Sequence, residues 1–375
     1  MRKQIRIPAA FLLISCLVAL LGGTAGTCAQ PDPKETCAHA LHDKTGICAE
    51  CGEPCLHSYL NSKCSVCGKE LKFEEKLLDR SWFAECEEKG TVESVYYDTK
   101  NYSAEGTPGI RKKMNVYLPY GYDPSEKYDV LVLLPGYASN EDSLLVDPLT
   151  FGEEESESAM LSDLLDNIIF RKISRPVIAV NISWAADIGG TGLGWIWKND
   201  IQQVAEEMRN DIIPYLTENY STYATPGANR YDEEVRQHFG MFGFSYGAEM
   251  TYSALIPNCY DLFGWYATLS DPSIEWFTRE AGFTPEFDAE VAGKVIAESD
   301  LPVNYFYSGS GGTPLEISIE SSHDKYNLVR DHSEGKINRK NSSWVCIEDC
   351  GHDSGMVLTS IFNVLQEFNN IRFSK

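Results

Sequence analysis

From about residue 90 onward, short apolar runs alternate with longer amphipathic stretches. The run at 130–134 is apolar at every position and ends at Pro135-Gly136, as expected of a strand buried on both faces of a parallel sheet. Such alternation predicts an α/β fold, a mostly parallel sheet with helices on both faces. We expect strands at 92–97, 114–118, 130–134, 176–182, 239–244, 263–269, 303–307 and 343–347, and helices at 162–170, 200–220, 246–255, 315–329 and 354–368.

The sequence Gly243-Phe244-Ser245-Tyr246-Gly247 falls between an expected strand and the helix that follows it. A G-x-S-x-G pattern in this context is typical of a nucleophile elbow, a strained turn that presents the serine hydroxyl. The turn also aims the next backbone N–H, that of Tyr246, at the place where an oxyanion develops. The loop after the strand at 130–134 would supply a second donor, and we expect this to be the amide of Tyr137. Ser245 is therefore the predicted nucleophile.

A serine nucleophile of this kind needs a general base, which in α/β-hydrolases follows the serine and the acid in chain order. Three histidines follow Ser245 in the chain. His323 and His332 lie in polar surroundings, where solvated side chains account for them. His352 follows the last expected strand, in a loop at the carboxyl ends of the strands, where ligands bind in such folds. We therefore expect His352 to be the base.

Six motifs follow one another between residues 92 and 372, at 116–122, 130–136, 212–216 with 219–221, 243–248, 269–270 and 351–353. In these motifs the chain resembles the family 1 carbohydrate esterases, which include the feruloyl and acetylxylan esterases. The resemblance implies an α/β-hydrolase that cleaves acyl esters on plant cell-wall polysaccharide, with Ser245 as the nucleophile and His352 as the base of a Ser-His-acid mechanism.

The chain departs from that family's pattern in three places. The oxyanion loop reads Pro135-Gly136 where the family usually has His-Gly, and Tyr246-Gly247-Ala248 replaces its usual Met and double Gly. The family's acid position, after the penultimate strand, falls on Gly312. Glu316, one helical turn further on, and Asp271, after the preceding strand, are equal candidates for the acid. Losing the acid would lower turnover by about 10⁴ without abolishing it.

Three tryptophans are candidates for substrate contacts. Trp184, Trp195 and Trp197 surround the glycine-rich stretch 189–194, in a loop expected at the carboxyl ends of the strands. Exposed rings there would stack on a sugar or on a feruloyl ring, although core or lid packing explains them equally well. The glycines do not match a phosphate loop, because no Gly-Lys-Ser/Thr follows them.

Six of the twelve cysteines lie between residues 37 and 67, in two similar units. Each unit has three thiols and one imidazole in a C-x-H, C-x-x-C-G pattern, the ligand set of a closed structural zinc site. About 35 residues bury too little apolar surface to fold alone, so metal would supply the missing stability. Disulfides are the alternative in an exported protein. We expect a zinc-ribbon-like module at 37–70 with two structural zinc ions and no catalytic cofactor. Its ligands would be Cys37, His39, Cys48, Cys51, Cys55, His57, Cys64 and Cys67.

The first 29 residues have the order of a secretory signal peptide: basic residues, an apolar stretch at 7–21, then small residues. About 15 apolar residues fall short of the roughly 20 that span a bilayer, which argues against a transmembrane anchor. A weak lipoprotein box ending at Cys16 is the alternative to release. We expect a secreted or envelope-associated protein.

The charge balance excludes some partners. The chain has 32 Lys and Arg against 55 Asp and Glu, a formal net charge of −23. Such a surface repels phosphate backbones and anionic lipid, so neither nucleic acid nor a membrane surface is an expected partner. Export would allow disulfides among the cysteines outside the module, with Cys259 and Cys350 expected near each other beside the site. These cysteines are Cys86, Cys259, Cys346 and Cys350.

These patterns predict a signal peptide at 1–29, a zinc-ribbon-like module at 37–70 and an α/β-hydrolase esterase domain at 90–375. The predicted function is an exported serine carboxylesterase acting on feruloyl or acetyl esters of polysaccharide or oligosaccharide, such as xylan. The alternative is a non-catalytic carbohydrate- or protein-binding homologue that has lost its triad acid. The oligomeric state is not predicted.

Overall fold

The computed structural model describes residues 72–102, 108–137, 139–150, 158–183, 198–272 and 285–373, and the strands β1 (Tyr59–Leu60) and β2 (Lys63–Cys64). The chain divides after Cys55, and all described residues belong to the second unit, Leu56–Lys375. The expected signal peptide and most of the Cys/His module therefore lie outside the described residues. β1 and β2 pair antiparallel, with Tyr59 opposite Cys64.

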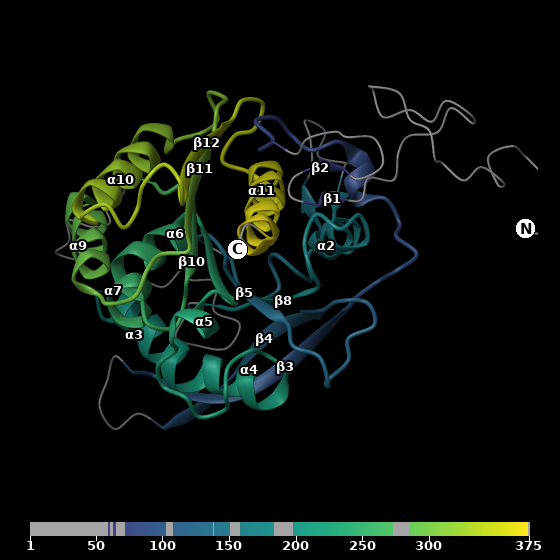
Figure 1. Ribbon diagram of the computed structural model, residues 1–375, viewed down its shortest axis with the longest axis horizontal. Coiled ribbons are helices and arrows are strands. Elements are labelled where there is room, and N and C mark those ends of the chain that lie inside the picture. The colour runs from purple at the N-terminus through teal and green to yellow at the C-terminus, as the bar shows by residue number, and fades with distance from the viewer. Residues whose placement is uncertain are drawn as a thin grey trace, which may run out of the picture. The chain divides into compact units, whose positions relative to one another are not determined.

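An eight-stranded sheet in the order β12-β11-β10-β9-β5-β8-β4-β3 forms the centre of the second unit (Figure 1). The strands from β12 to β8 are mutually parallel, and β4 and β3 continue the sheet antiparallel. The predicted mostly parallel sheet is confirmed. Its strands are β3 (Thr91–Lys100), β4 (Gly109–Leu118), β5 (Asp129–Leu134), β8 (Val177–Asn181), β9 (Phe239–Phe244), β10 (Trp265–Leu269), β11 (Tyr305–Gly311) and β12 (Ser342–Ile347). A separate antiparallel ribbon joins β6 (Leu149–Thr150) and β7 (Ser158–Ala159).

Helices cover both faces of this sheet (Figure 1). One face carries α2 (Leu161–Phe170) and α11 (Ser354–Phe373). The other carries α3 (Lys198–Glu207), α6 (Tyr246–Met250), α7 (Ile256–Cys259), α9 (Pro285–Glu298) and α10 (Ile319–His332). The π-helical turns η2 (Met208–Ile212) and η3 (Thr251–Leu255) continue α3 into α4 (Ile213–Asn219) and α6 into α7. Two short elements are η1 (Arg80–Phe83) and α5 (Glu233–Arg236).

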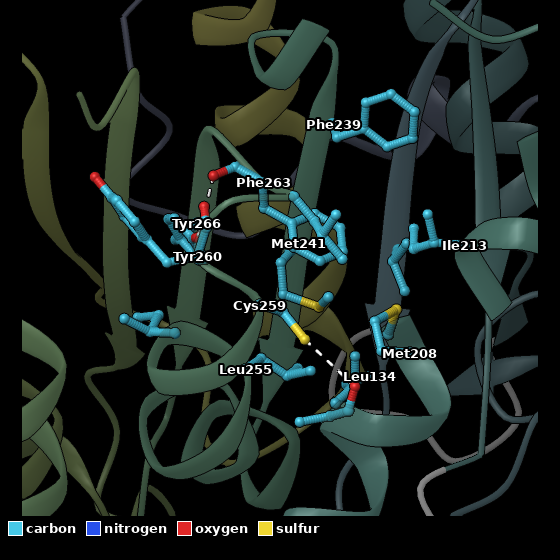
Figure 2. Packing of buried hydrophobic residues seen from close by; sticks show 14 of the residues in the cluster. Leu134, Met208, Ile213, Phe239, Met241, Leu255, Cys259, Tyr260, Phe263 and Tyr266 are labelled. Atoms are coloured by element: carbon cyan, nitrogen blue, oxygen red, sulfur yellow. Dashed lines mark hydrogen bonds between the residues drawn. The ribbon is translucent and has the colours of Figure 1, made fainter. Parts of the chain in front are cut away.

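A large part of the apolar core lies between the sheet and this second helical layer (Figure 2). Leu134 and Met241 of the sheet meet Met208 and Leu255 of the helices there. Cys259 belongs to this core, and burial raises the pKa of its thiol to about 12. Cys86, Cys259, Cys346 and Cys350 are all free thiols, so no disulfide joins any two of them, including the pair Cys259 and Cys350 expected to lie close together.

Besides the short elements η1 and α5, two longer helices differ from the sequence-based expectation. The helix expected from residue 315 begins at Ile319, because residues 313–318 form a turn instead. Helix α9 was not predicted, since its fully buried positions include Ala289 and Ala292, whose small side chains weaken the hydrophobic periodicity. Among the helices that the structure describes, none has the length and apolar character needed to cross a membrane.

Candidate active site

The turn between β9 and α6 holds Ser245 in a strained conformation, with φ +52°. Glycines flank it because no side chain fits. A Cβ on Gly243 would lie 2.3 Å from the carbonyl oxygen of Gly247, and a Cβ on Gly247 would lie 2.3 Å from that of Leu134. Ser245 N–H donates to the carbonyl of Leu269 in β10 at 2.7 Å. The G-x-S-x-G pattern therefore has a steric cause, and the turn is fixed to the neighbouring strands.

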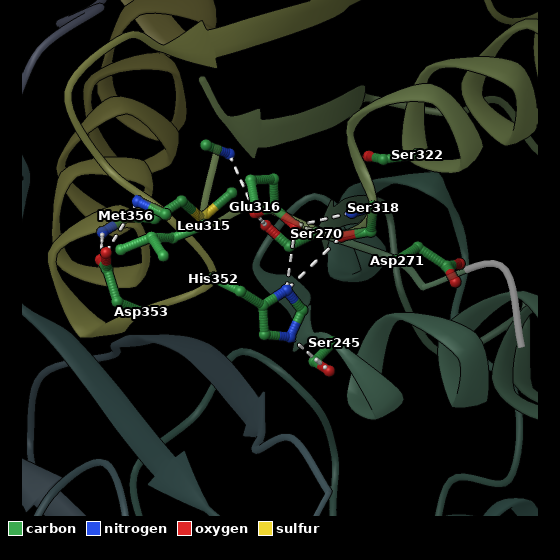
Figure 3. A network of polar contacts seen from close by, with 12 residues as sticks. Ser245, Ser270, Asp271, Leu315, Glu316, Ser318, Ser322, His352, Asp353 and Met356 are labelled. Atoms are coloured by element: carbon green, nitrogen blue, oxygen red, sulfur yellow. Dashed lines mark hydrogen bonds and ion pairs between the residues drawn. The ribbon is translucent and has the colours of Figure 1, made fainter. Parts of the chain in front are cut away.

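Three side chains from distant parts of the chain form a continuous polar line (Figure 3). His352 Nε2 lies 2.9 Å from Ser245 Oγ, and His352 Nδ1 lies 3.0 Å from Glu316 Oε1. A neutral imidazole with its proton on Nδ1 donates to Glu316 and accepts from the Ser245 hydroxyl. This arrangement can activate a serine hydroxyl as a nucleophile.

The Glu316 carboxylate is surrounded by donors. Oε1 also accepts from the backbone N–H of Ser318 at 2.9 Å and from its hydroxyl. Oε2 accepts from Ser270 Oγ at 2.6 Å and from the N–H of Gly311 at 3.2 Å. Burial alone would raise the pKa of Glu316, but the hydrogen bonds from His352, Ser270 and Ser318 outweigh it and lower the pKa to about 2. Glu316 is thus ionised over the whole neutral range.

Gly312, the position that the resemblance to family 1 carbohydrate esterases predicts for the acid, has no room for a side chain. A Cβ there would lie 2.9 Å from both Cys346 Sγ and the Cα of Glu348. The N–H of Gly312 donates to the carbonyls of Ile347 and Cys350, which holds it against the turn before His352. The carboxylate reaches His352 from Glu316 instead, through the turn at 313–318.

Asp271, the other candidate for the acid, does not reach His352. Its carboxylate is buried and lies 2.9 Å from Lys325 Nζ, on α10. Its neighbour Ser270 is the residue that contacts the acid, with a positive φ of 43° that turns the chain at the end of β10. Of the two candidates, the structure therefore brings Glu316 to the histidine.

The loop that carries His352 is held from two sides. Asp353 accepts from the N–H groups of Gly351 and Met356, which shapes the entry into α11. On the other side, Glu348 N–H donates to the carbonyl of Glu75, and Leu77 N–H donates to Asp349 at 2.6 Å. The segment before η1 is thus bonded directly to the histidine loop.

The two segments that carry the expected oxyanion donors lie next to the nucleophile. A Cβ on Gly136 would lie 3.2 Å from Ser245 Cβ, so the Pro135-Gly136 backbone passes close to the serine. Tyr137 follows it with a side chain that is 42% exposed, and its ring centroid lies 6.4 Å from that of buried Tyr246. The two amides nominated from the sequence thus belong to the segments on either side of Ser245.

Two further histidines take no part in this geometry. His323 packs against Trp344, and His332 Nδ1 contacts the carbonyl of Leu328 within α10. Among the side chains that the structure describes, no group of His, Cys, Asp and Glu is arranged to hold a metal ion. The three tryptophans Trp184, Trp195 and Trp197 lie outside the described residues, as do the side chains of all eight nominated zinc ligands.

Sequence reasoning missed Ser270 and Ser318, which fix the acid. Ser270 belongs to a motif that carries the resemblance to family 1 carbohydrate esterases, but nothing in that motif indicates that its hydroxyl binds a carboxylate 46 positions away. Ser318 lies in the segment expected to be helical, although α10 begins only at Ile319.

The sheet, the elbow and the Ser245–His352–Glu316 line define a protein of the α/β-hydrolase fold with the geometry of a serine hydrolase. No family model matches the chain. Over 196 residues it is 29% identical to endo-1,4-beta-xylanase Y from Acetivibrio thermocellus. The match spans 52% of this chain but only 16% of that enzyme.

Two solved structures share the fold. One is a mutant of the feruloyl esterase module from Clostridium thermocellum in complex with sinapinate, with a TM-score of 0.61 and 23% identity over 80% of this chain and 96% of that one. The other is a ferulic acid esterase from Anaeromyces mucronatus in complex with ferulic acid, with a TM-score of 0.59 and 19% identity over 81% of this chain and 100% of that one. At these identities the similarity establishes the fold alone.

Proposed function

We propose that this chain is an exported serine carboxylesterase that hydrolyses feruloyl or acetyl esters on plant cell-wall polysaccharide. The observation that carries the proposal is the unbroken line of contacts from Ser245 through His352 to an ionised Glu316. Each member has the chemistry its place requires: a nucleophile on a strained turn, a base that can accept its proton, and a carboxylate that stabilises the resulting imidazolium.

In the acylation step, Ser245 Oγ attacks the ester carbonyl while His352 Nε2 accepts the hydroxyl proton. Glu316 remains ionised and orients the ring through Nδ1. The tetrahedral oxyanion would accept hydrogen bonds from the amides of Tyr246 and Tyr137. His352 then protonates the leaving sugar hydroxyl, and the acyl group remains on Ser245.

In the deacylation step, water replaces the sugar alcohol and donates its proton to His352 Nε2 as it attacks the acyl carbonyl. Collapse of the second tetrahedral intermediate returns the proton to Ser245 and releases the free acid. No metal or organic cofactor is needed for either step.

The substrate class rests on the comparisons. Two of the neighbours that cover 80% or more of this chain are named as a feruloyl esterase module and a ferulic acid esterase, and were solved with sinapinate and ferulic acid bound. The relative in sequence is named as a xylanase. Trp184, Trp195 and Trp197 would supply stacking surfaces for the acyl ring or the sugar.

The alternative, a binding protein without catalysis, was motivated by the glycine at the family's acid position. With Glu316 3.0 Å from His352, that motivation disappears, because the orienting carboxylate is supplied from four residues later. We therefore favour the enzyme.

The N-terminal segments complete the proposal. Residues 1–29 would direct export, and the Cys/His module at 37–70 would bind two structural zinc ions. The antiparallel pair β1–β2 lies between His57 and Cys67 of the module's second unit, which suits a zinc ribbon, in which a hairpin carries ligand residues.

The test compares the mature chain with Ser245→Ala on p-nitrophenyl acetate and on a feruloylated arabinose. We expect hydrolysis by the wild type that the variant lacks, and the preferred ester separates feruloyl from acetyl specificity. If both proteins are equally inactive on a broad panel of esters, the proposed esterase activity is wrong.

A further inference from the structure

Four ionisable side chains are buried together beside the nucleophile helix. Lys325 of α10 lies against Glu249 of α6 and Asp271 at the end of β10, and Asp288 of α9 belongs to the same electrostatic cluster. Each is at most 4% exposed. We call these four residues the buried charge cluster. The catalytic steps above use none of them.

The cluster connects the helix that follows Ser245 with the turn that holds Glu316. Glu249 lies one helical turn after Ser245, and its N–H donates to the Ser245 carbonyl at 3.2 Å. Asp271 directly follows Ser270, whose hydroxyl holds Glu316. Lys325 Nζ donates to both carboxylates, at 2.9 Å in the case of Asp271. One ammonium group thus ties the helix of the nucleophile to the turn that holds the acid.

The charges do not balance unless the cluster holds protons. With every group ionised, three carboxylates against one ammonium would leave two uncompensated negative charges in the interior, which is energetically costly. Three carboxyl oxygens, one each from Glu249, Asp271 and Asp288, have no hydrogen-bond donor among the described residues. Protons shared between neighbouring carboxyl groups would supply the missing hydrogen bonds of these oxygens.

The electrostatics agree with this arrangement. Burial raises the pKa of Asp271 to about 8 and that of Asp288 to about 9, with the negative charge of Glu249 adding to both. Burial would also raise the pKa of Glu249, but the positive charge of Lys325 outweighs burial and lowers this pKa. Tyr252 of η3, whose ring faces Lys325, has a pKa that burial raises, so the phenol stays neutral. At neutral pH the cluster therefore holds one ion pair and two protonated carboxyl groups.

We propose that Lys325 is a positioning residue for the triad, acting through Glu249 and Asp271. The cluster holds Ser245 and Glu316 at their catalytic positions only while its carboxyl groups keep their shared protons. The inference rests on the proposed esterase function. Loss of the protons leaves carboxylates that repel one another across the α6 helix and the Ser270-Asp271 turn. A displacement of about 1 Å in catalytic geometry can lower a rate by about a hundred-fold.

The first test removes the ammonium from the full-length chain. Lys325→Met is expected to lower kcat by about ten- to a hundred-fold with little change in KM, because substrate does not touch Lys325. Lys325→Arg keeps the charge and should restore much of the loss. The control is Asp129→Asn, which removes a buried carboxylate bonded to His238 at the opposite ends of the strands. It should leave the pH dependence of kcat unchanged.

The second test uses asparagine, whose amide donates a hydrogen bond as a protonated carboxyl does but cannot lose the proton. In the wild type, kcat should fall between about pH 7 and about pH 9.5 as the cluster is deprotonated. The double variant Asp271→Asn with Asp288→Asn has no proton to lose there. Its ratio of kcat at about pH 9.5 to that at about pH 7 should exceed the wild-type ratio several-fold.

A magnetic-resonance measurement without substrate separates the positioning role of the cluster from the esterase function. The downfield proton resonance of His352 Nδ1–H reports its bond to Glu316 and should weaken at alkaline pH in the wild type but persist in the double variant. If the wild type hydrolyses no ester, this result counts against the esterase function and not against the positioning role of the cluster. A folded Lys325→Met with wild-type kcat overturns the positioning role. If that variant does not fold, identical alkaline behaviour of the double variant and the wild type, in both kcat and the resonance, overturns it instead.

Discussion

Glu316 Oε1 lies 3.0 Å from His352 Nδ1, although the resemblance to family 1 carbohydrate esterases predicts the acid at Gly312. The turn at 313–318 brings a carboxylate from four residues after that position to the histidine, and the hydroxyl groups of Ser270 and Ser318 hold it there. The path of this turn, and not the position in the sequence alone, decides which carboxylate orients His352.

Removing the charge of Glu316 should be costly for turnover. Glu316→Gln leaves the shape but replaces the carboxylate that selects the His352 tautomer, so we expect kcat to fall by about 10³ to 10⁴. Steady-state kinetics on p-nitrophenyl acetate measure the loss. Glu320→Gln, an exposed position in the first turn of α10, is the matched control and should behave as wild type. Wild-type turnover by Glu316→Gln would mean that another group orients the base.

An acid at Gly312, the position that the resemblance predicts, should not rescue that variant. An aspartate at 312 needs a Cβ where Cys346 Sγ and the backbone of Glu348 already lie within 2.9 Å. We expect Gly312→Asp to lower the free energy of unfolding by about 1 to 3 kcal/mol, as overpacking does. Combined with Glu316→Gln it should remain inactive. Denaturant unfolding and kinetics on the double variant test both statements, and recovered activity would contradict them.

Glu316 should also make the free energy of unfolding depend on pH in the acidic range. The pKa of Glu316 is lowered from its ordinary 4.5 to about 2, so the unfolded chain binds more protons than the folded one between these values. Its contribution to stability is complete above about pH 4.5 and is lost as the pH falls toward about 2. Glu316→Gln should lack this component. Urea unfolding at several pH values compares the two slopes, and equal slopes would argue against an ionised, hydrogen-bonded Glu316.

The segment before η1 should stabilise the histidine loop. Asp349→Ala removes the acceptor for Leu77 N–H, and we expect it to cost about 1 kcal/mol of unfolding free energy. Asp349→Asn keeps an oxygen acceptor and serves as the control. If both variants unfold at the same denaturant concentration, the bond to Leu77 carries no stability.

The Cys/His module should contain metal. After exhaustive dialysis of the mature chain, we expect about two zinc ions per molecule by elemental analysis, one for each Cys3His set. Cys48→Ser should lower that number. Less than one zinc per chain, together with a loss of free thiols in the denatured protein, would favour disulfides in residues 37–67.

The sheet and the elbow could be predicted because their signals are local. The apolar run at 130–134 and the glycines around Ser245 report burial and steric demand within a few residues of each other. The order of strands and helices then placed His352 at the carboxyl ends of the strands. These inferences needed no knowledge of how remote segments pack.

The choice between Glu316 and Asp271 could not be made in the same way. It depends on Gly312 packing against the end of β12 and on where α10 begins, which are contacts between segments far apart in the sequence. The same holds for Lys325, whose partner Glu249 is 76 positions away. A lysine in an amphipathic helix looks solvent-exposed until its buried partners are known.

The most direct test of the account asks whether Ser245 is an activated nucleophile. The mature chain would be treated with an organophosphorus ester reagent, digested, and analysed by mass spectrometry for the modified residue. We expect a single covalent adduct on Ser245 and a much slower reaction in His352→Ala, because the hydroxyl then lacks its base. A folded protein that is not labelled, or is labelled at another serine, would contradict the account.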